Sequence, residues 1–72
     1  SPKDGQEYWI ETFGADVFAL SHNKLWSHDF GEYKDSSVSG YISTHKFQAA
    51  GVIRFKYYSG ANCWTYTWVE ER

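Results

Sequence analysis

The sequence predicts an all-β protein: a small antiparallel β-sandwich of two sheets with about six strands. Short segments rich in aromatic and β-branched residues alternate with glycine, asparagine and serine turn signals about every eight to twelve residues. No segment keeps the apolar spacing of an amphipathic helix over several turns. The strongest strand pattern lies in the last third of the chain, and the other elements are assigned around it.

A C-terminal β-hairpin is predicted for residues 51–59 and 62–69, around the two-residue loop Gly60-Ala61. Glycine at the first central position suits a type II′ turn, whose twist matches that of the flanking strands. Because side chains alternate along a strand, one face is apolar and pairs Tyr57 with Trp64, Phe55 with Tyr66 and Ile53 with Trp68. The opposite face is mixed, with Val52, Arg54, Lys56 and Tyr58 opposite Val69, Thr67, Thr65 and Cys63. The apolar face needs a second sheet to cover it, and the hairpin therefore predicts a sandwich.

Residues 7–13 form the first predicted strand, with Trp9 and Phe13 on one face and Tyr8 and Ile10 on the other. A turn follows at residues 14–16. Residues 1–6 are polar, contain the only proline and are expected to fray. The whole chain, residues 1–72, is expected to form a single domain.

A second hairpin is predicted for residues 17–21 and 24–27, which flank His22-Asn23. Asparagine tolerates the left-handed conformation that a tight hairpin turn requires. This hairpin would pair Leu20 with Leu25 and Phe18 with Ser27, and it would leave Ala19 and Trp26 on the opposite face.

The middle of the chain is less regular. Residues 28–37 are polar and charged and are expected to form a loop, and residues 38–43 are expected to form a fourth strand in which Gly40 marks a bulge. Residues 44–50 fit either one helical turn or a strand joined by a bend, and both alternatives stay open.

Composition limits the classes of function. Seven Lys and Arg against nine Asp and Glu give a net charge of −2, which argues against general nucleic-acid binding. No apolar run approaches the ~20 residues of a membrane span. Cys63 is the only cysteine, and an internal disulfide is therefore excluded. Since so small a domain is marginally stable, an aromatic core is expected, and self-association as a homodimer stays open.

Catalytic and metal sites find little support in the sequence. The second hairpin could bring His22 and His28 together near Asp29, but these residues and His45 fall in predicted turns and loops without the spacing of a known zinc motif. Cys63 sits beside Tyr58 without a group that would lower the thiol pKa, so it is interpreted as a spectator. We therefore expect no enzyme activity, no metal and no cofactor.

The aromatic surplus is more informative. Four Trp, six Tyr and five Phe exceed what the interior of so small a domain can hold. Exposed rings with an N–H or O–H at their edge suit flat amphipathic partners such as sugars, peptides or another protein surface. At least one exposed aromatic patch is expected, although each single ring is more often a core residue.

Several features follow one another in an order that is more informative than any of them alone. They are Trp9 followed by Gly14, then Val17 with Ser21-His22-Asn23, Asp35-Ser36-Ser37-Val38, Gln48-Ala49-Ala50-Gly51-Val52, and last Cys63-Trp64-Thr65-Tyr66-Thr67-Trp68. In this order the chain resembles the small secreted bacteriocins of the septum-inhibiting lactococcin type. The resemblance implies an exported two-sheet sandwich that binds the cell-wall precursor lipid II and blocks septum formation without enzymatic activity.

A ligand of this kind offers sugars, a peptide and a pyrophosphate, which suggests both rings and cations as its contacts. Aromatic faces could meet the sugars, and cations could meet the diphosphate through charge-assisted hydrogen bonds. The candidate ligand-binding residues are Trp9, Lys24, Trp26, Tyr41, Arg54, Lys56 and Tyr58. For the three cations, solvated charges on a strand face are the alternative interpretation.

Two other functions remain open. One is a small secreted binding or inhibitory β-module that acts on a carbohydrate or a hydrolase, with a hairpin edge adding to the partner's sheet. The other, less favoured, is a small metal-dependent or cysteine enzyme.

Overall fold

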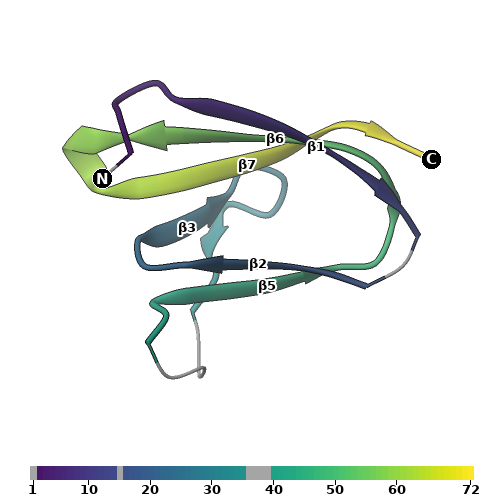
Figure 1. Cartoon of the computed structure of the whole chain (residues 1–72), viewed down its shortest axis with the longest axis horizontal. Coiled ribbons are helices and arrows are strands. Elements are labelled where there is room, and N and C mark those ends of the chain that lie inside the picture. The colour runs from purple at the N-terminus through teal and green to yellow at the C-terminus, as the bar shows by residue number, and fades with distance from the viewer. Residues whose placement is uncertain (1, 15, 36–39) are drawn as a thin grey trace.

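The structure, a computed structural model, describes residues 2–14, 16–35 and 40–72 and consists almost entirely of β-strands (Figure 1). Two sheets face each other, as predicted: a five-stranded sheet in the order β1-β6-β7-β3-β4 and a two-stranded sheet of β2 and β5. The elements are β1 (Glu7–Phe13), β2 (Val17–Ser21), β3 (Lys24–Ser27), β4 (Glu32–Tyr33), β5 (Ser43–Phe47), β6 (Ala50–Tyr58), a 3₁₀ turn (Ser59–Ala61) and β7 (Cys63–Glu71).

The C-terminal hairpin of β6 and β7 has the predicted pairs on its apolar face: Ile53 with Trp68, Phe55 with Tyr66 and Tyr57 with Trp64. The predicted two-residue turn is wrong, because the chain turns through Ser59–Ala61 and then through Asn62, which is left-handed at φ 48°. The Asn62 N–H donates to the Ser59 carbonyl at 3.1 Å. The loop gains one residue from each strand, and the register is therefore unchanged.

A register irregularity lies at the other end of this hairpin. The pairing shifts between Val52 and Ile53, so Val52 faces Glu70 and not the predicted Val69. Gly51 precedes the shift with φ at 155°, and a Cβ at that position would lie 2.0 Å from the Glu70 carbonyl oxygen. Only glycine fits this close approach of the two backbones.

Strand β1 has the predicted bounds and pairs antiparallel with β6. Tyr8 is opposite Phe55 and Ile10 opposite Ile53, so these two β1 side chains point toward the second sheet. Pairing also continues before β1, because the Gly5 N–H donates to the Tyr57 carbonyl at 2.8 Å. Hydrogen bonds thus tie the segment for which the sequence predicts fraying to β6.

The predicted second hairpin does not form. Strand β2 pairs with β5, whereas β3 pairs parallel with β7 and antiparallel with β4, so the described strands include a parallel pair. A hairpin would place Ala19 and Leu25 on opposite faces, but the step from one sheet to the other turns both toward the core. The corner is held by Asn23, whose N–H donates to Ser21 Oγ at 3.0 Å and whose amide donates to Asn62 Oδ1 at 2.9 Å.

In the middle of the chain, the structure can be compared with the prediction in three places. The expected loop 28–37 contains the short strand β4. Part of the expected strand 38–43 lies outside the described residues, and residues 40–42 form a turn and a bend, with Gly40 at φ 85° and not in a bulge. For residues 44–50 the strand alternative is confirmed: β5 ends at residue 47 and a bend leads into β6.

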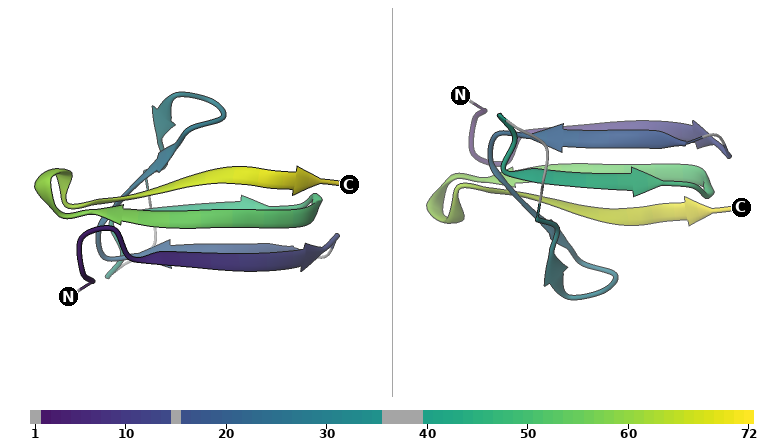
Figure 2. Two further views of the ribbon diagram at one scale, coloured as in Figure 1. Left: turned by 90° about the horizontal axis from the view of Figure 1, so that it is seen from above. Right: turned by 90° about the horizontal axis from the view of Figure 1, so that it is seen from below.

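The core lies between the two sheets. Leu25, Phe47, Ile53 and Tyr66 are buried, and the rings of Phe47 and Tyr66 meet edge to face at 5.0 Å. Figure 2 shows that β2 and β5 lie over the sheet of β1, β6 and β7, while β3 crosses β7 at an angle and leads β4 beyond its edge. One side of the five-stranded sheet therefore faces β2 and β5, and its other side faces away from them.

Candidate functional site

The outer face of the five-stranded sheet, the side turned away from β2 and β5, collects most of the predicted ligand-binding residues. Alternation along β6 turns Ile53, Phe55 and Tyr57 inward, so the residues between and after them point outward. The predicted residues on this face are Trp9, Lys24, Trp26, Arg54, Lys56 and Tyr58.

The register aligns these residues in rows across the strands. Trp9 is opposite Arg54, and Tyr58 is opposite Cys63, which is in turn opposite Lys24. The row between them runs from Lys56 through Thr65 and Trp26 to Tyr33. Since neighbouring strands lie about 4.8 Å apart, one extended ligand could contact several members of a row.

A hollow of about 300 Å³, here called the outer hollow, opens on this face beside the 3₁₀ turn, on the side of β7, β3 and β4. Its lining comes from β3, β4, the 3₁₀ turn, β7 and the end of β6: Trp26, His28, Tyr33, Tyr58, Ala61, Cys63 and Thr65. Rings thus form its walls, and the small buried side chains of β7 form its floor.

Tyr33 belongs to this site although it is not among the predicted binding residues. Its ring meets that of Trp26 edge to face, with centroids 4.8 Å apart and planes at 73°. The sequence places Tyr33 in a polar loop, and a two-residue strand has no periodicity that could reveal its pairing with β3.

Three cations, Lys24, Arg54 and Lys56, lie on the outer face. Lys24 Nζ lies 5.5 Å from the centroid of the Tyr33 ring, and Lys56 Nζ lies 5.6 Å from that of Tyr58. Lys56 also faces Glu7, at 4.0 Å between nitrogen and oxygen. Within the described part of the chain, the Arg54 side chain has no hydrogen bond or ion pair, which leaves its guanidinium available to an anion.

Tyr41 lies apart from the outer face. It follows the turn before β5, and its ring stacks on His22 with centroids 4.8 Å apart and planes at 17°. The structure thus brings six of the seven predicted binding residues to one face and places Tyr41 away from them.

The loop that bears His28 is tied to β7 beyond the end of β3. Both carboxylate oxygens of Asp29 accept hydrogen bonds there, from Thr67 Oγ1 at 2.9 Å and from the Trp68 N–H at 3.1 Å. The Trp68 amide, which has no partner strand on that side, is thus satisfied by a side chain. This contact fixes one rim of the outer hollow.

The groups at the floor suit binding better than bond breaking. The Cys63 thiol is buried, it donates to the Trp64 carbonyl at 3.2 Å, and burial raises its pKa. A protonated thiol is a poor nucleophile. Thr65 Oγ1 donates to the Lys56 carbonyl at 3.1 Å. Both groups therefore shape the floor.

The three histidines lie in different places: His22 against Tyr41, His28 at the outer hollow and His45 inside the sandwich against Tyr66. Across residues 2–14, 16–35 and 40–72, no group of three or more His, Cys, Asp or Glu side chains is placed to hold a metal ion. In the same residues no helix is long and apolar enough to cross a membrane.

Comparisons with known proteins add no assignment: no family model, curated protein or solved structure matches this chain. The site is therefore interpreted from its own geometry.

Proposed function

We propose that the protein is a secreted, non-catalytic binding protein that takes an anionic glycan of the cell envelope on its outer face. In line with the bacteriocin resemblance, the proposed ligand is the cell-wall precursor lipid II, and the proposed consequence is a block of septum formation. The observation that supports this most is the gathering of Trp9, Trp26, Tyr58 and three cations on one solvent-facing side of a sheet.

The chemistry of the outer face suits a ligand with both sugar rings and phosphate. Trp26, Tyr33 and Tyr58 present apolar ring surface with polar edges, which matches the mixed faces of a sugar. Arg54 and Lys24 have no acidic partner in the described residues, so neither must break an ion pair to bind a phosphate. Guanidinium groups bind phosphate oxygens through two parallel charge-assisted hydrogen bonds.

Titration of ¹⁵N-labelled protein with lipid II in neutral detergent micelles tests the proposal. The indole N–H signals of Trp9 and Trp26 are expected to shift, because both rings lie on the outer face. Arg54→Gln is expected to weaken binding roughly 10-fold, the loss of about 1.5 kcal/mol for a hydrogen bond to a charged group. The same variant should lose the septation defect that the protein causes in Gram-positive cells.

Lys46→Gln is the matched control, because Lys46 is also a strand cation but pairs with Asp16 on the two-stranded sheet, at 3.6 Å. Its affinity should equal that of the unchanged protein. Equal losses in both variants would indicate non-specific charge attraction, and no indole shift with lipid II would reject the ligand. If the protein bound a neutral oligosaccharide as tightly as lipid II, the proposed contacts between the cations and the phosphates would be rejected, but the sugar contacts would not.

A second candidate, inhibition of a hydrolase, has one specific observation in its favour. Strand β1 is an edge of the five-stranded sheet, and its Trp9 side chain is 57% exposed. The Tyr57 N–H donates to the Gln6 carbonyl, so alternation directs the backbone groups of Glu7, Trp9 and Glu11 away from β6, toward a partner strand. Trp9→Pro removes one of these N–H groups, and it should abolish inhibition of a susceptible hydrolase without unfolding the edge strand.

A further inference from the structure

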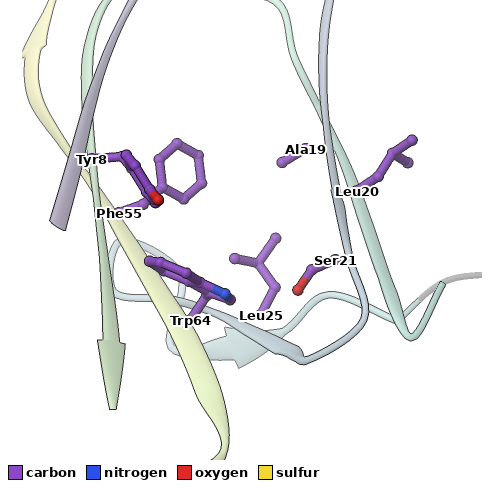
Figure 3. Close-up of a pocket in the computed structure, with 7 residues that line it drawn as sticks. All are labelled: Tyr8, Ala19, Leu20, Ser21, Leu25, Phe55 and Trp64. Atoms are coloured by element: carbon purple, nitrogen blue, oxygen red, sulfur yellow. The ribbon is translucent and has the colours of Figure 1, made fainter. Parts of the chain in front are cut away.

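The sandwich is open along one side, between the edge strands β1 and β2. Two hollows of about 260 and 310 Å³ lie there, and they share Ala19, Leu20 and Phe55, so they form one continuous depression, here called the inner trough. Figure 3 shows the hollow at its Tyr8 and Ser21 end, with Tyr8, Phe55 and Trp64 on one side and Ala19 facing them from β2. The inner trough lies on the opposite side of the five-stranded sheet from the outer face.

The walls of the inner trough are apolar along its length. Ile10, Phe55 and Ile53 line it from one sheet, and Val17, Ala19 and Phe47 from the other. Among the residues that the structure describes, no charged side chain lines either hollow. At the mouth, Tyr8 is 50% exposed and Ile10 is 41% exposed, so water meets apolar surface that the fold itself does not cover.

The two hydroxyl groups of the inner trough already have partners. Ser21 Oγ accepts the Asn23 N–H at 3.0 Å, and the Tyr8 hydroxyl accepts a hydrogen bond from the Gln6 amide. A ligand with a polar group at every few atoms, such as a peptide or a sugar, would lose its water there and gain few hydrogen bonds. A hydrocarbon chain has no polar groups and therefore loses no hydrogen bonds to water. Apolar cavities in proteins bind apolar molecules.

We infer that the inner trough binds a single unbranched hydrocarbon chain of an uncharged amphiphile, with its polar head at the Tyr8 and Ser21 end. The two joined hollows follow each other from Tyr8 to Ile10 along β1 and from Ser21 to Val17 along β2, which fits a chain better than a compact ring system. In both of their hydrogen bonds the Tyr8 and Ser21 hydroxyl oxygens are acceptors, so each O–H group can still donate to one small polar head. Both hydroxyl groups lie in the same hollow, which defines the direction of the chain. The inner trough and the outer face lie on opposite sides of the sheet, so binding in the trough is independent of the proposed function.

Hexanol, octanol and decanol are suitable probes, because they vary the chain and keep one small head that carries no sugar or phosphate. The affinity measured by NMR titration should rise about fourfold for each added CH₂, the equivalent of about 0.8 kcal/mol per buried methylene. The Trp64 indole N–H, in the wall of the inner trough, should shift, while those of Trp9 and Trp26 on the outer face should not.

Two variants that each add volume form a matched pair. Ala19 points into the inner trough (Figure 3), whereas Ile42 is exposed and lines neither hollow. Ala19→Leu should fill the trough and reduce decanol affinity at least 10-fold, whereas Ile42→Phe should leave it unchanged. If Ala19→Leu does not fold, Tyr8→Ala and Trp9→Ala replace the pair, and only Tyr8→Ala should weaken binding.

Three results would overturn the inference. The first is an affinity that does not depend on chain length, and the second is a shift of Trp9 or Trp26 in place of Trp64. The third is a concentration-dependent dimer in sedimentation experiments that Ala19→Leu abolishes, since it would assign the inner trough to a second copy of the chain.

Discussion

Of all glycine-to-alanine replacements in this protein, Gly51→Ala should destabilise it most. The new Cβ would lie 2.0 Å from the Glu70 carbonyl oxygen and 2.9 Å from the carbonyl carbon. Both contacts are with the backbone of β7, which cannot move aside as a flexible side chain can. The φ of 155° also lies in a backbone region that residues other than glycine rarely adopt.

The size of the effect follows from these two causes. A strained backbone conformation costs about 1–3 kcal/mol, and a forced shift of close-packed groups costs about 1–3 kcal/mol more. Because the start of β6 can separate from β7 and relieve part of this strain, we expect a net loss of about 3 kcal/mol. For a domain of this size, that corresponds to a melting temperature lower by roughly 12–24 °C.

Urea denaturation followed by tryptophan fluorescence measures this loss. Gly60→Ala is the control, because a Cβ at Gly60 would meet no described atom within 4 Å and the φ of this residue is not positive. It should change the free energy of unfolding by less than about 0.5 kcal/mol. Equal stability of the two variants would refute the close approach of β6 and β7 at Gly51.

Three further variants test other contacts. Tyr66→Phe should stabilise the protein by about 1 kcal/mol in thermal unfolding, because the buried Tyr66 hydroxyl has no hydrogen-bond partner within the described chain. Asp29→Ala should cost about 1 kcal/mol, because Thr67 Oγ1 and the Trp68 N–H lose their acceptor; an unchanged urea midpoint would contradict this. Burial lowers the pKa of His45 in the folded protein. As the pH falls, the imidazole of the unfolded chain is therefore protonated before that of the folded chain, and stability should fall as the pH drops below about 6.5. His45→Gln should flatten that part of the pH–stability curve, and an unchanged slope would exclude His45 as its cause.

Local patterns are sufficient to predict the C-terminal hairpin. Ile53, Phe55 and Tyr57 alternate with polar residues, and only one register places them all against Trp64, Tyr66 and Trp68. The register is correct although the turn type is not, because a symmetric change of loop length leaves the pairing as it was. The bulge near Gly51 escapes prediction, since the close approach of Glu70 depends on a strand far along the chain.

Long-range strand pairing explains why the predicted second hairpin does not form. A hairpin at Asn23 is the simplest local arrangement, but it would turn either Ala19 or Leu25 away from the core. The fold instead sends β3 to pair in parallel with β7, almost forty residues further on. Such a partner cannot be recognised from a local pattern, because parallel neighbours are joined by long connections.

For the candidate site, too, local patterns place some residues and cannot place others. Alternation within a single strand assigns Arg54, Lys56 and Tyr58 to one face, which is a local property. The sequence does not place Tyr33 beside Trp26 or Tyr41 beside His22, because both contacts depend on how separate segments meet, which no local pattern reveals.

The most direct test of the proposed binding surface is a set of intermolecular nuclear Overhauser effects between bound lipid II and the aromatic rings of the protein. We predict contacts from the sugar protons to the rings of Trp26, Tyr33 and Tyr58 around the outer hollow. Contacts confined to the stacked pair of His22 and Tyr41 would place the ligand elsewhere and contradict the assignment of the outer face.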